Sequence, residues 1–393
     1  MDFEIMGTFA KLKNSILGCL ETFRNSAFYK GVQKINGYIR SHTWLVLVIC
    51  LATMVLTELL KFGIYPPEGF SDAYRMTQYL DGLNGNINEI SFRNTAAVFS
   101  LLHALFGSVN MQVWGWILLL PGAVVFSFLV LKAKPEGIFS CIILLGFSVF
   151  LPFYVFMTGV DYIQYMIFFF IALVLFYVPG QIFKLLGSIL LLLPIILFYR
   201  EYYVLMAGFS LFVFGVALLY RKPKNLREKS AFLCILACVV ILLIFVFHLL
   251  FKEEVDTLFT VRTLTNQTLG SNPAPNKLIL DAFPLDRSVP GFLANYIIAA
   301  IRLLFPLELL ADASDIPFVV FQILLLILII YQLRRSRMVQ GRTAVYSVIF
   351  AFFLMSFFFE PDFGSWFRHE AAAFPILWIG IGQDVEGRKR KDV

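Results

Sequence analysis

Charge is scarce in this sequence. Asp, Glu, Lys and Arg together make up 15% of its 393 residues, whereas hydrophobic residues make up 59%. Soluble domains are about a quarter charged and about half apolar. The sequence also lacks the glycine patterns of phosphate-binding loops and dinucleotide-binding folds, and the Gly-x-Ser-x-Gly motif of serine hydrolases. These absences exclude a soluble domain of ordinary composition and leave no recognisable site for nucleotide chemistry.

Cysteine and histidine are also rare, with five and four residues. The cysteines lie in the N-terminal region or inside apolar runs, and their spacing matches neither a zinc site nor a disulfide framework. We interpret them as packing residues. The sequence therefore predicts no metal site and no cofactor, and it leaves open whether a divalent metal takes part.

Long apolar runs fill most of the chain. A transmembrane helix needs about 20 largely apolar residues, and ten runs approach this length: 43–62, 112–131, 137–157, 162–178, 182–199, 203–220, 230–251, 316–333, 343–359 and 370–383. The first run follows 42 residues of mixed composition, so we expect a retained span and no cleavable signal. The pattern predicts an all-α, polytopic membrane protein with about ten transmembrane helices.

Two further stretches, 92–109 and 291–310, are apolar but interrupted by polar residues. Cytoplasmic loops carry an excess of Lys and Arg. If neither stretch crosses the membrane, 22 of the 32 Lys and Arg fall on the side of the N-terminus. If both crossed, the basic clusters at 132–137 and 221–230 would move outside. We therefore predict that both termini are cytoplasmic and that these two stretches lie on the outer face.

The predicted organisation has three parts. A cytoplasmic amphipathic segment covers 1–42, a membrane domain covers 43–383, and a basic cytoplasmic tail covers 384–393. The membrane domain has long outer loops at 62–111 and 252–315. The basic clusters fix this topology and contact anionic lipids, so the formal net charge of +6 does not indicate nucleic-acid binding.

Ionisable residues gather next to apolar sequence on the predicted outer face. Asp72 lies near the start of a helix predicted over 73–82, where it is a plain N-cap, an available base, or both. Asp161 begins a span. Arg200 and Glu201 occupy a tight turn at membrane depth, where charges are costly, so they pair with each other, extend to the lipid headgroups, or serve a function.

The stretch EPDFGSWFRHEAAAFPI, at 360–376, places five ionisable residues between apolar runs. Pro361 and Gly364 predict a helix break, after which Arg368 and His369 begin the last span. At the positive end of a helix these cations need an anion. Either a neighbouring carboxylate or the phosphate of a lipid-linked substrate would supply it.

The order of these features resembles the EpsG/Wzy-like polysaccharide polymerases. The resemblance rests on GFSDAYRMTQY at 69–79, EISFR at 89–93, VDYIQYMIFFFIALVLF at 160–176 and FRHEAAAFPI at 367–376. The layout is also similar to that of the GT-C glycosyltransferases, which have an acidic residue early in the first outer loop and helices lying along the membrane. The resemblance implies glycosyl transfer from an undecaprenyl-linked donor to a second lipid-linked glycan, at the outer face of a bacterial plasma membrane.

Such a transfer needs a carboxylate that takes the proton of the acceptor hydroxyl, and cations that hold the phosphate leaving group. We predict Asp72 as the catalytic base, with Arg200, Arg368 and His369 binding the phosphate. The secondary candidates are Arg75, Asp161, Glu201, Arg262 and Arg302.

Three other functions compete with a polymerase. The chain could be a GT-C transferase that adds a single sugar, a lipid or glycan transporter, or a scaffold that binds partners through its outer loop. Transporters tend to place polar residues near the midplane of the membrane, whereas the charges here lie next to one surface. The predicted partners are a lipid-linked glycan, membrane lipids and other envelope-glycan assembly proteins.

Overall fold

The computed structural model describes residues 27–82, 90–107, 110–220, 228, 230–231, 289–335, 342–360 and 362–384. The longer helices are α2 (Ala27–Ser41), α3 (Thr43–Ile64), α5 (Ile90–Phe106), α6 (Met111–Lys132), α7 (Ile138–Phe150), α8 (Val160–Tyr177), α9 (Gln181–Phe198), α10 (Tyr203–Leu219), α13 (Val289–Leu304), α14 (Ile316–Arg335) and α15 (Thr343–Phe359). The shorter elements are η1 (Pro67–Gly69), α4 (Ser71–Leu80), the π-helical turn η2 (Leu151–Val155), η3 (Leu307–Ala311), η4 (Ala313–Asp315), α16 (Phe363–Ala372) and α17 (Phe374–Ile381). Two strands of two residues each, β1 (Ala133–Lys134) and β2 (Gln383–Asp384), pair antiparallel.

Six of these helical segments are long and apolar enough to cross a membrane: Thr43–Ile64, Met111–Lys132, Ile138–Val155, Val160–Tyr177, Gln181–Phe198 and Ala313–Arg334. The prediction of a helical protein with several membrane-spanning helices agrees with this finding. Helices α10 and α15 are apolar but shorter, and the predicted run at 230–251 lies almost wholly outside the described residues. The count of ten spans stays a prediction.

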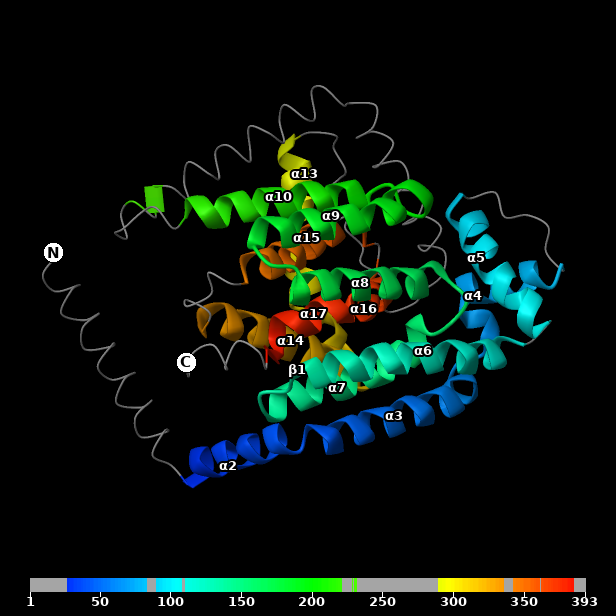
Figure 1. Cartoon of the computed structure of the whole chain (residues 1–393), viewed down its shortest axis with the longest axis horizontal. Helices are drawn as coiled ribbons and strands as arrows, with labels where there is room; N and C mark the ends of the chain where they lie inside the picture. Colours follow the sequence, from blue (N-terminus) through cyan, green and yellow to red (C-terminus); the bar gives the residue numbers. More distant parts are fainter. Residues whose placement is uncertain are drawn as a thin grey trace, which may run out of the picture.

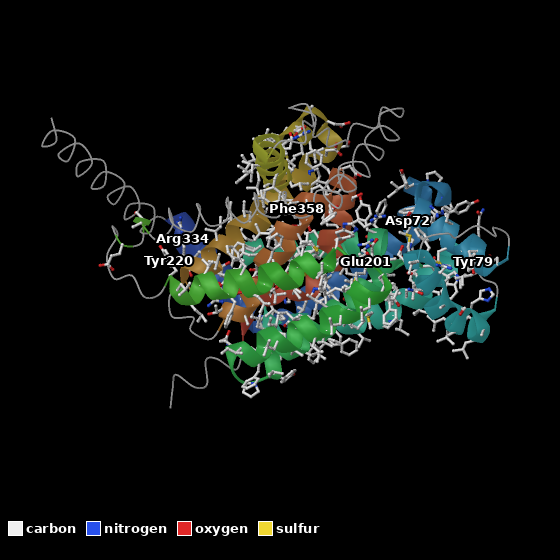
Figure 2. The ribbon with its side chains drawn as sticks, turned by 90° about the horizontal axis from the view of Figure 1, so that it is seen from above. Asp72, Tyr79, Glu201, Tyr220, Arg334 and Phe358 are labelled. Atoms are coloured by element: carbon white, nitrogen blue, oxygen red, sulfur yellow. The ribbon has the colours of Figure 1, made fainter. Side chains whose placement is uncertain are left out.

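The long helices run side by side along the long axis of the molecule (Figure 1). The helix pairs α6 and α7, α8 and α9, and α9 and α10 run in opposite directions, because short turns at 133–137, 178–180 and 199–202 join them. In Figure 2, Asp72 and Glu201 lie toward one end of the molecule, and Tyr220 and Arg334 toward the other. These two residues, which were predicted to share the outer face, therefore lie toward the same end of the bundle.

The opposite end is held by hydrogen bonds from the side chains of Trp378, Gln332 and Arg40. The Nε1 of Trp378 donates to the carbonyl of Ala133 at 2.8 Å, which fixes α17 beside β1. The Nε2 of Gln332 donates to Oε2 of Glu136 at 2.9 Å, and the Nε of Arg40 donates to the Glu136 carbonyl at 3.0 Å. These bonds join α2, α14 and α17 to the loop at 133–137.

Helix α5 lies at the charged end of the bundle, across the direction of the long helices (Figure 1). Its buried face includes Phe92 and Phe99, whereas Leu101 and Leu105 are 71% and 78% exposed. An exposed apolar face on a helix in this position is typical of helices that lie in the membrane interface. The Nδ2 of Asn94 donates to the carbonyl of Phe198 at 2.6 Å and fastens α5 to the end of α9.

The last apolar run differs from the prediction. The sequence predicted one span over 370–383, whereas the structure has α16 followed by α17. Helix α16 begins early because the Asp362 carboxylate accepts from the backbone N–H of Ser365 at 2.7 Å and caps the helix. The helix ends at Ala372, and Pro375 lies in the first turn of α17, where its missing N–H leaves no intrahelical hydrogen bond unmade.

Close packing between α6 and the turn before α8 depends on Gly122. A β-carbon at this position would lie 2.5 Å from the ring of Phe156, which is fully buried. We expect Gly122→Ala to lower the free energy of unfolding by about 1–3 kcal/mol, because the buried ring has little room to move. Thermal or SDS-induced unfolding of the purified protein in detergent measures this loss.

Gly208 in α10 provides the matched control, because a β-carbon there would meet no atom within 4 Å. Gly208→Ala should leave the stability unchanged or raise it slightly, since alanine favours the helix. Equal losses in the two variants would contradict the packing argument.

Candidate functional site

Six ionisable side chains form a charged cluster at one end of the bundle. Its members are Asp72, Asp161, Arg200, Glu360, Arg368 and His369. They come from α4, α8, the turn between α9 and α10, the end of α15, and α16. All of the primary candidates predicted from the sequence belong to this cluster.

Asp161 is the centre of the charged cluster. Its Oδ1 lies 3.0 Å from Nη2 of Arg200, and its Oδ2 lies 3.2 Å from Nε of Arg368. The carboxylate is in the first turn of α8, and its side chain is 11% exposed. This position places one carboxylate between two guanidinium groups that are far apart in the chain. Asp161 therefore organises the cations that were predicted to bind phosphate.

Asp72 forms an ion pair with Arg368 at the more solvent-exposed side of the charged cluster. The Nη1 of Arg368 donates to Oδ2 of Asp72 at 3.0 Å, and the two side chains are 27% and 45% exposed. The prediction of an N-cap is wrong, because α4 begins at Ser71, two residues before the predicted start, and Phe70 is its cap residue. Asp72 lies in the first turn with its carboxylate bonded to Arg368. It is the most exposed acid of the charged cluster.

Arg200 faces the bundle rather than the neighbouring acid. Its Nη1 donates to Oε1 of Gln164 at 2.9 Å, and its Nη2 binds Asp161. Glu201, the next residue, is exposed. The alternative of an Arg200–Glu201 ion pair is therefore wrong. Gln164 was not predicted, although its spacing of three residues from Asp161 places both on one face of α8.

His369 bonds to a carboxylate through one ring nitrogen and to a guanidinium through the other. Its Nδ1 lies 2.7 Å from Oε1 of Glu360, and its Nε2 lies 2.9 Å from Nη1 of Arg200. A guanidinium has only donors, so Nε2 must accept and Nδ1 must carry the proton given to Glu360. The hydrogen-bond network thus assigns a neutral imidazole. In this arrangement His369 adds no positive charge.

Arg368 and His369 are not at the start of a helix. Helix α16 begins at Phe363, and His369 lies in its last turn. The predicted attraction of an anion by the positive end of the helix is therefore wrong for these two residues. Burial alone would lower the pKa of Arg368, but the carboxylates of Asp161 and Asp72 raise that pKa above its ordinary value. The carboxylates, and not the N-terminal end of a helix, therefore stabilise the buried positive charge of Arg368.

The predicted pairing of Arg368 and His369 with nearby acids is right in part. Glu360 pairs with His369, whereas Asp362 caps α16. Glu370 is fully buried beside Gln322 in α14. His369 is therefore paired with an acid close to it in the sequence, whereas Arg368 is paired with acids that are distant in the sequence.

The secondary candidates lie in other surroundings. The guanidinium of Arg75 lies 4.5 Å from the ring centroid of Phe92, a cation–π contact between α4 and α5. Arg302 forms a bidentate pair with Glu308. Arg262 lies outside the described residues. The structure therefore brings Asp161 into the charged cluster and leaves Arg75 and Arg302 in contacts of their own.

Within the described part of the chain, no group of three or more His, Cys, Asp or Glu side chains is arranged to hold a metal ion. Comparison with protein-family models, with curated proteins and with solved structures found no match to this chain. The chemistry of the charged cluster is therefore argued from its own geometry. It offers a half-exposed carboxylate next to two fixed cations at the end of an apolar helical bundle.

Proposed function

We propose that this chain is a bacterial membrane glycosyltransferase of the polysaccharide-polymerase type, which joins undecaprenyl-linked glycan units. In this proposal it has a GT-C-like layout and crosses the plasma membrane ten times. Both termini are cytoplasmic, and the charged cluster faces the outside. A GT-C transferase that adds a single sugar is the nearest alternative.

The observation that carries the proposal is the pairing of Asp72 with Arg368, beside Arg200 and Asp161. The acceptor hydroxyl would attack the anomeric carbon of the donor sugar while the bond from that carbon to the phosphate oxygen breaks. Asp72 would take the hydroxyl proton, and the two guanidinium groups would hold the leaving phosphate as its charge grows. Arginine suits this task because its planar fork of donors matches phosphate.

The position of the charged cluster supports a lipid-linked substrate. It lies at the end of long apolar helices, where the phosphate of a polyprenyl lipid would meet protein at the edge of the hydrocarbon. Exposed apolar residues of α5 lie at the same end of the bundle. A soluble donor would need neither feature.

The function is tested by deleting the gene and examining the surface glycan. Single-repeat glycan indicates a lost polymerase, and full-length chains that lack one decoration indicate a lost transferase. Unchanged glycan would contradict both.

Complementation with Asp72→Asn or Arg368→Ala should each give less than about 1% of the wild-type product at normal membrane levels, since one variant lacks the base and the other a phosphate ligand. Gel analysis of the extracted glycan, with immunoblots of membranes, measures both quantities. Asp81→Asn is the control, because Asp81 pairs with His103 at 3.3 Å at the far end of α4. Normal product from Asp72→Asn would exclude Asp72 as the base.

A further inference from the structure

The charged cluster has no surplus of positive charge. With His369 neutral, Arg200 and Arg368 supply two positive charges, while three members of the cluster are carboxylates. The carboxylates are Asp72, Asp161 and Glu360. If all of these pairs stayed in place, a bound phosphate would add negative charge to a site whose carboxylates already outnumber its guanidinium groups. Binding of an anion therefore requires one carboxylate to give up its cation.

The exposed fractions identify which carboxylate gives way. The side chains of Asp161 and Glu360 are 11% and 3% exposed, whereas that of Asp72 is 45% exposed. Releasing a buried carboxylate from its partner is costly, and releasing an exposed one costs little because water replaces the bond. Asp72 is therefore the acid that can leave.

Arg368 can exchange one partner while it keeps another. Its Nε lies 3.2 Å from Oδ2 of Asp161, and its Nη1 donates separately to Oδ2 of Asp72. The ion pair with Asp161 keeps the guanidinium against the bundle. The Nη1 group, which now donates to the half-exposed Asp72, could donate to a new anion without movement of the rest of the arginine.

Helix α4 does not have to move when Asp72 leaves. Ala73 and Met76 are buried, and Oγ1 of Thr158 donates to the Ala73 carbonyl at 3.1 Å. Rotation of one side chain is sufficient. The released carboxylate would remain in the first turn of α4, where the positive end of the helix stabilises a negative charge.

We propose that Asp72 and the phosphate of a lipid-linked substrate compete for Arg368, so that phosphate binding releases the carboxylate that then serves as the base. The inference rests on the proposed function and adds an order of events to it. Before the phosphate arrives, the Asp72 carboxylate is the counter-ion of Arg368 and is held in that ion pair. The base becomes available only when the leaving group is in place, which limits wasteful hydrolysis of the donor.

The test measures binding separately from turnover. The full-length protein is purified in detergent and titrated with farnesyl phosphate as the probe, using isothermal calorimetry. Asp72→Asn should bind the probe about two- to fivefold more tightly than the wild type, because a competing ion pair of this exposure is worth up to about fivefold in affinity. Asp72→Ala is a second variant with the same expectation. Both should lack glycan product.

Two controls separate competition from a general effect of charge. Asp81→Asn removes the same charge from the C-terminal end of α4, and its affinity for the probe should equal that of the wild type. Arg368→Gln should bind the probe more weakly than every other variant. If Asp72 served only as the base and did not compete with phosphate, its replacement would leave the affinity for the probe unchanged.

Three results would overturn the inference. Equal or weaker binding by both Asp72 variants, with weaker binding by Arg368→Gln, would reject the competition and leave the proposed function in place. Equal tightening in Asp72→Asn and Asp81→Asn would assign the effect to net charge. Absence of binding by the wild type and by both Asp72 variants would reject the inference together with the phosphate-binding role on which it rests.

Discussion

Lys61→Met should lower the free energy of unfolding by about 3–5 kcal/mol, the cost of leaving a buried charge without its partner. The Nζ of Lys61 lies 2.7 Å from Oε1 of Glu58, one turn earlier in α3, and both side chains are fully buried. The same Nζ donates to the carbonyl of Pro152 at 3.3 Å, where the π-helical turn η2 approaches. Methionine has a similar length but no charge, so the variant isolates the loss of the ion pair.

The double variant Glu58→Met/Lys61→Met distinguishes the ion pair from the packing. A buried pair is costly to desolvate, and its replacement by apolar side chains of similar volume is often neutral or stabilising. We therefore expect the double variant to recover to within about 1 kcal/mol of the wild type. SDS-induced unfolding in detergent, followed by tryptophan fluorescence, measures all three proteins. Equal losses in the single and double variants would show that the uncompensated charge is not the cause.

Asp161→Asn should produce the second large effect. We expect it to lower the free energy of unfolding by about 3 kcal/mol and to abolish the glycan product. Its carboxylate is the shared partner of Arg200 and Arg368, at 3.0 and 3.2 Å. Asparagine keeps the size and one acceptor oxygen but removes the negative charge. Two guanidinium groups would then repel each other without an ion between them. The product should be lost because both groups leave the positions in which they would hold a phosphate.

Glu308→Gln is the control for Asp161→Asn. Glu308 also pairs with an arginine, Arg302, but its side chain is 44% exposed. Exposed pairs contribute up to about 1 kcal/mol, so this variant should unfold nearly as the wild type does. Thermal unfolding in detergent and glycan analysis apply to both variants. Similar stability losses in the two would contradict the central role of Asp161.

The agreement between predicted and observed helices has a local cause. Hydropathy predicted spans over 112–131 and 162–178, and the structure has helices at Met111–Lys132 and Val160–Tyr177. An apolar run of this length must bury its backbone polar groups in a helix wherever it meets lipid. Because successive spans reverse direction, the loops that carry Asp72, Asp161 and Arg200 had to meet at one end.

Helix ends were harder to predict, because single side chains decide them. Asp362 caps α16 and moves its start several residues upstream of the predicted span, which changes the electrostatic surroundings of Arg368 and His369. Asp72 showed the opposite error: it looked like a cap, and its carboxylate instead bonds to another helix. Both residue types fit either role, and the sequence offers no measure of which partner is closer.

The sequence by itself determined that the chain is helical and apolar, and which loops share an end, because these follow from hydropathy and the alternation of spans. Only the tertiary structure decided the partners. Asp72 and Arg368 are 296 positions apart, and Arg200 and His369 are 169 apart. A pairing of this kind depends on how helices pack and on which side chains are buried together, and no pattern along the chain encodes it. The same packing placed His369 between Glu360 and Arg200 and left Asp72 as the exposed acid, which together give the charged cluster its proposed chemistry.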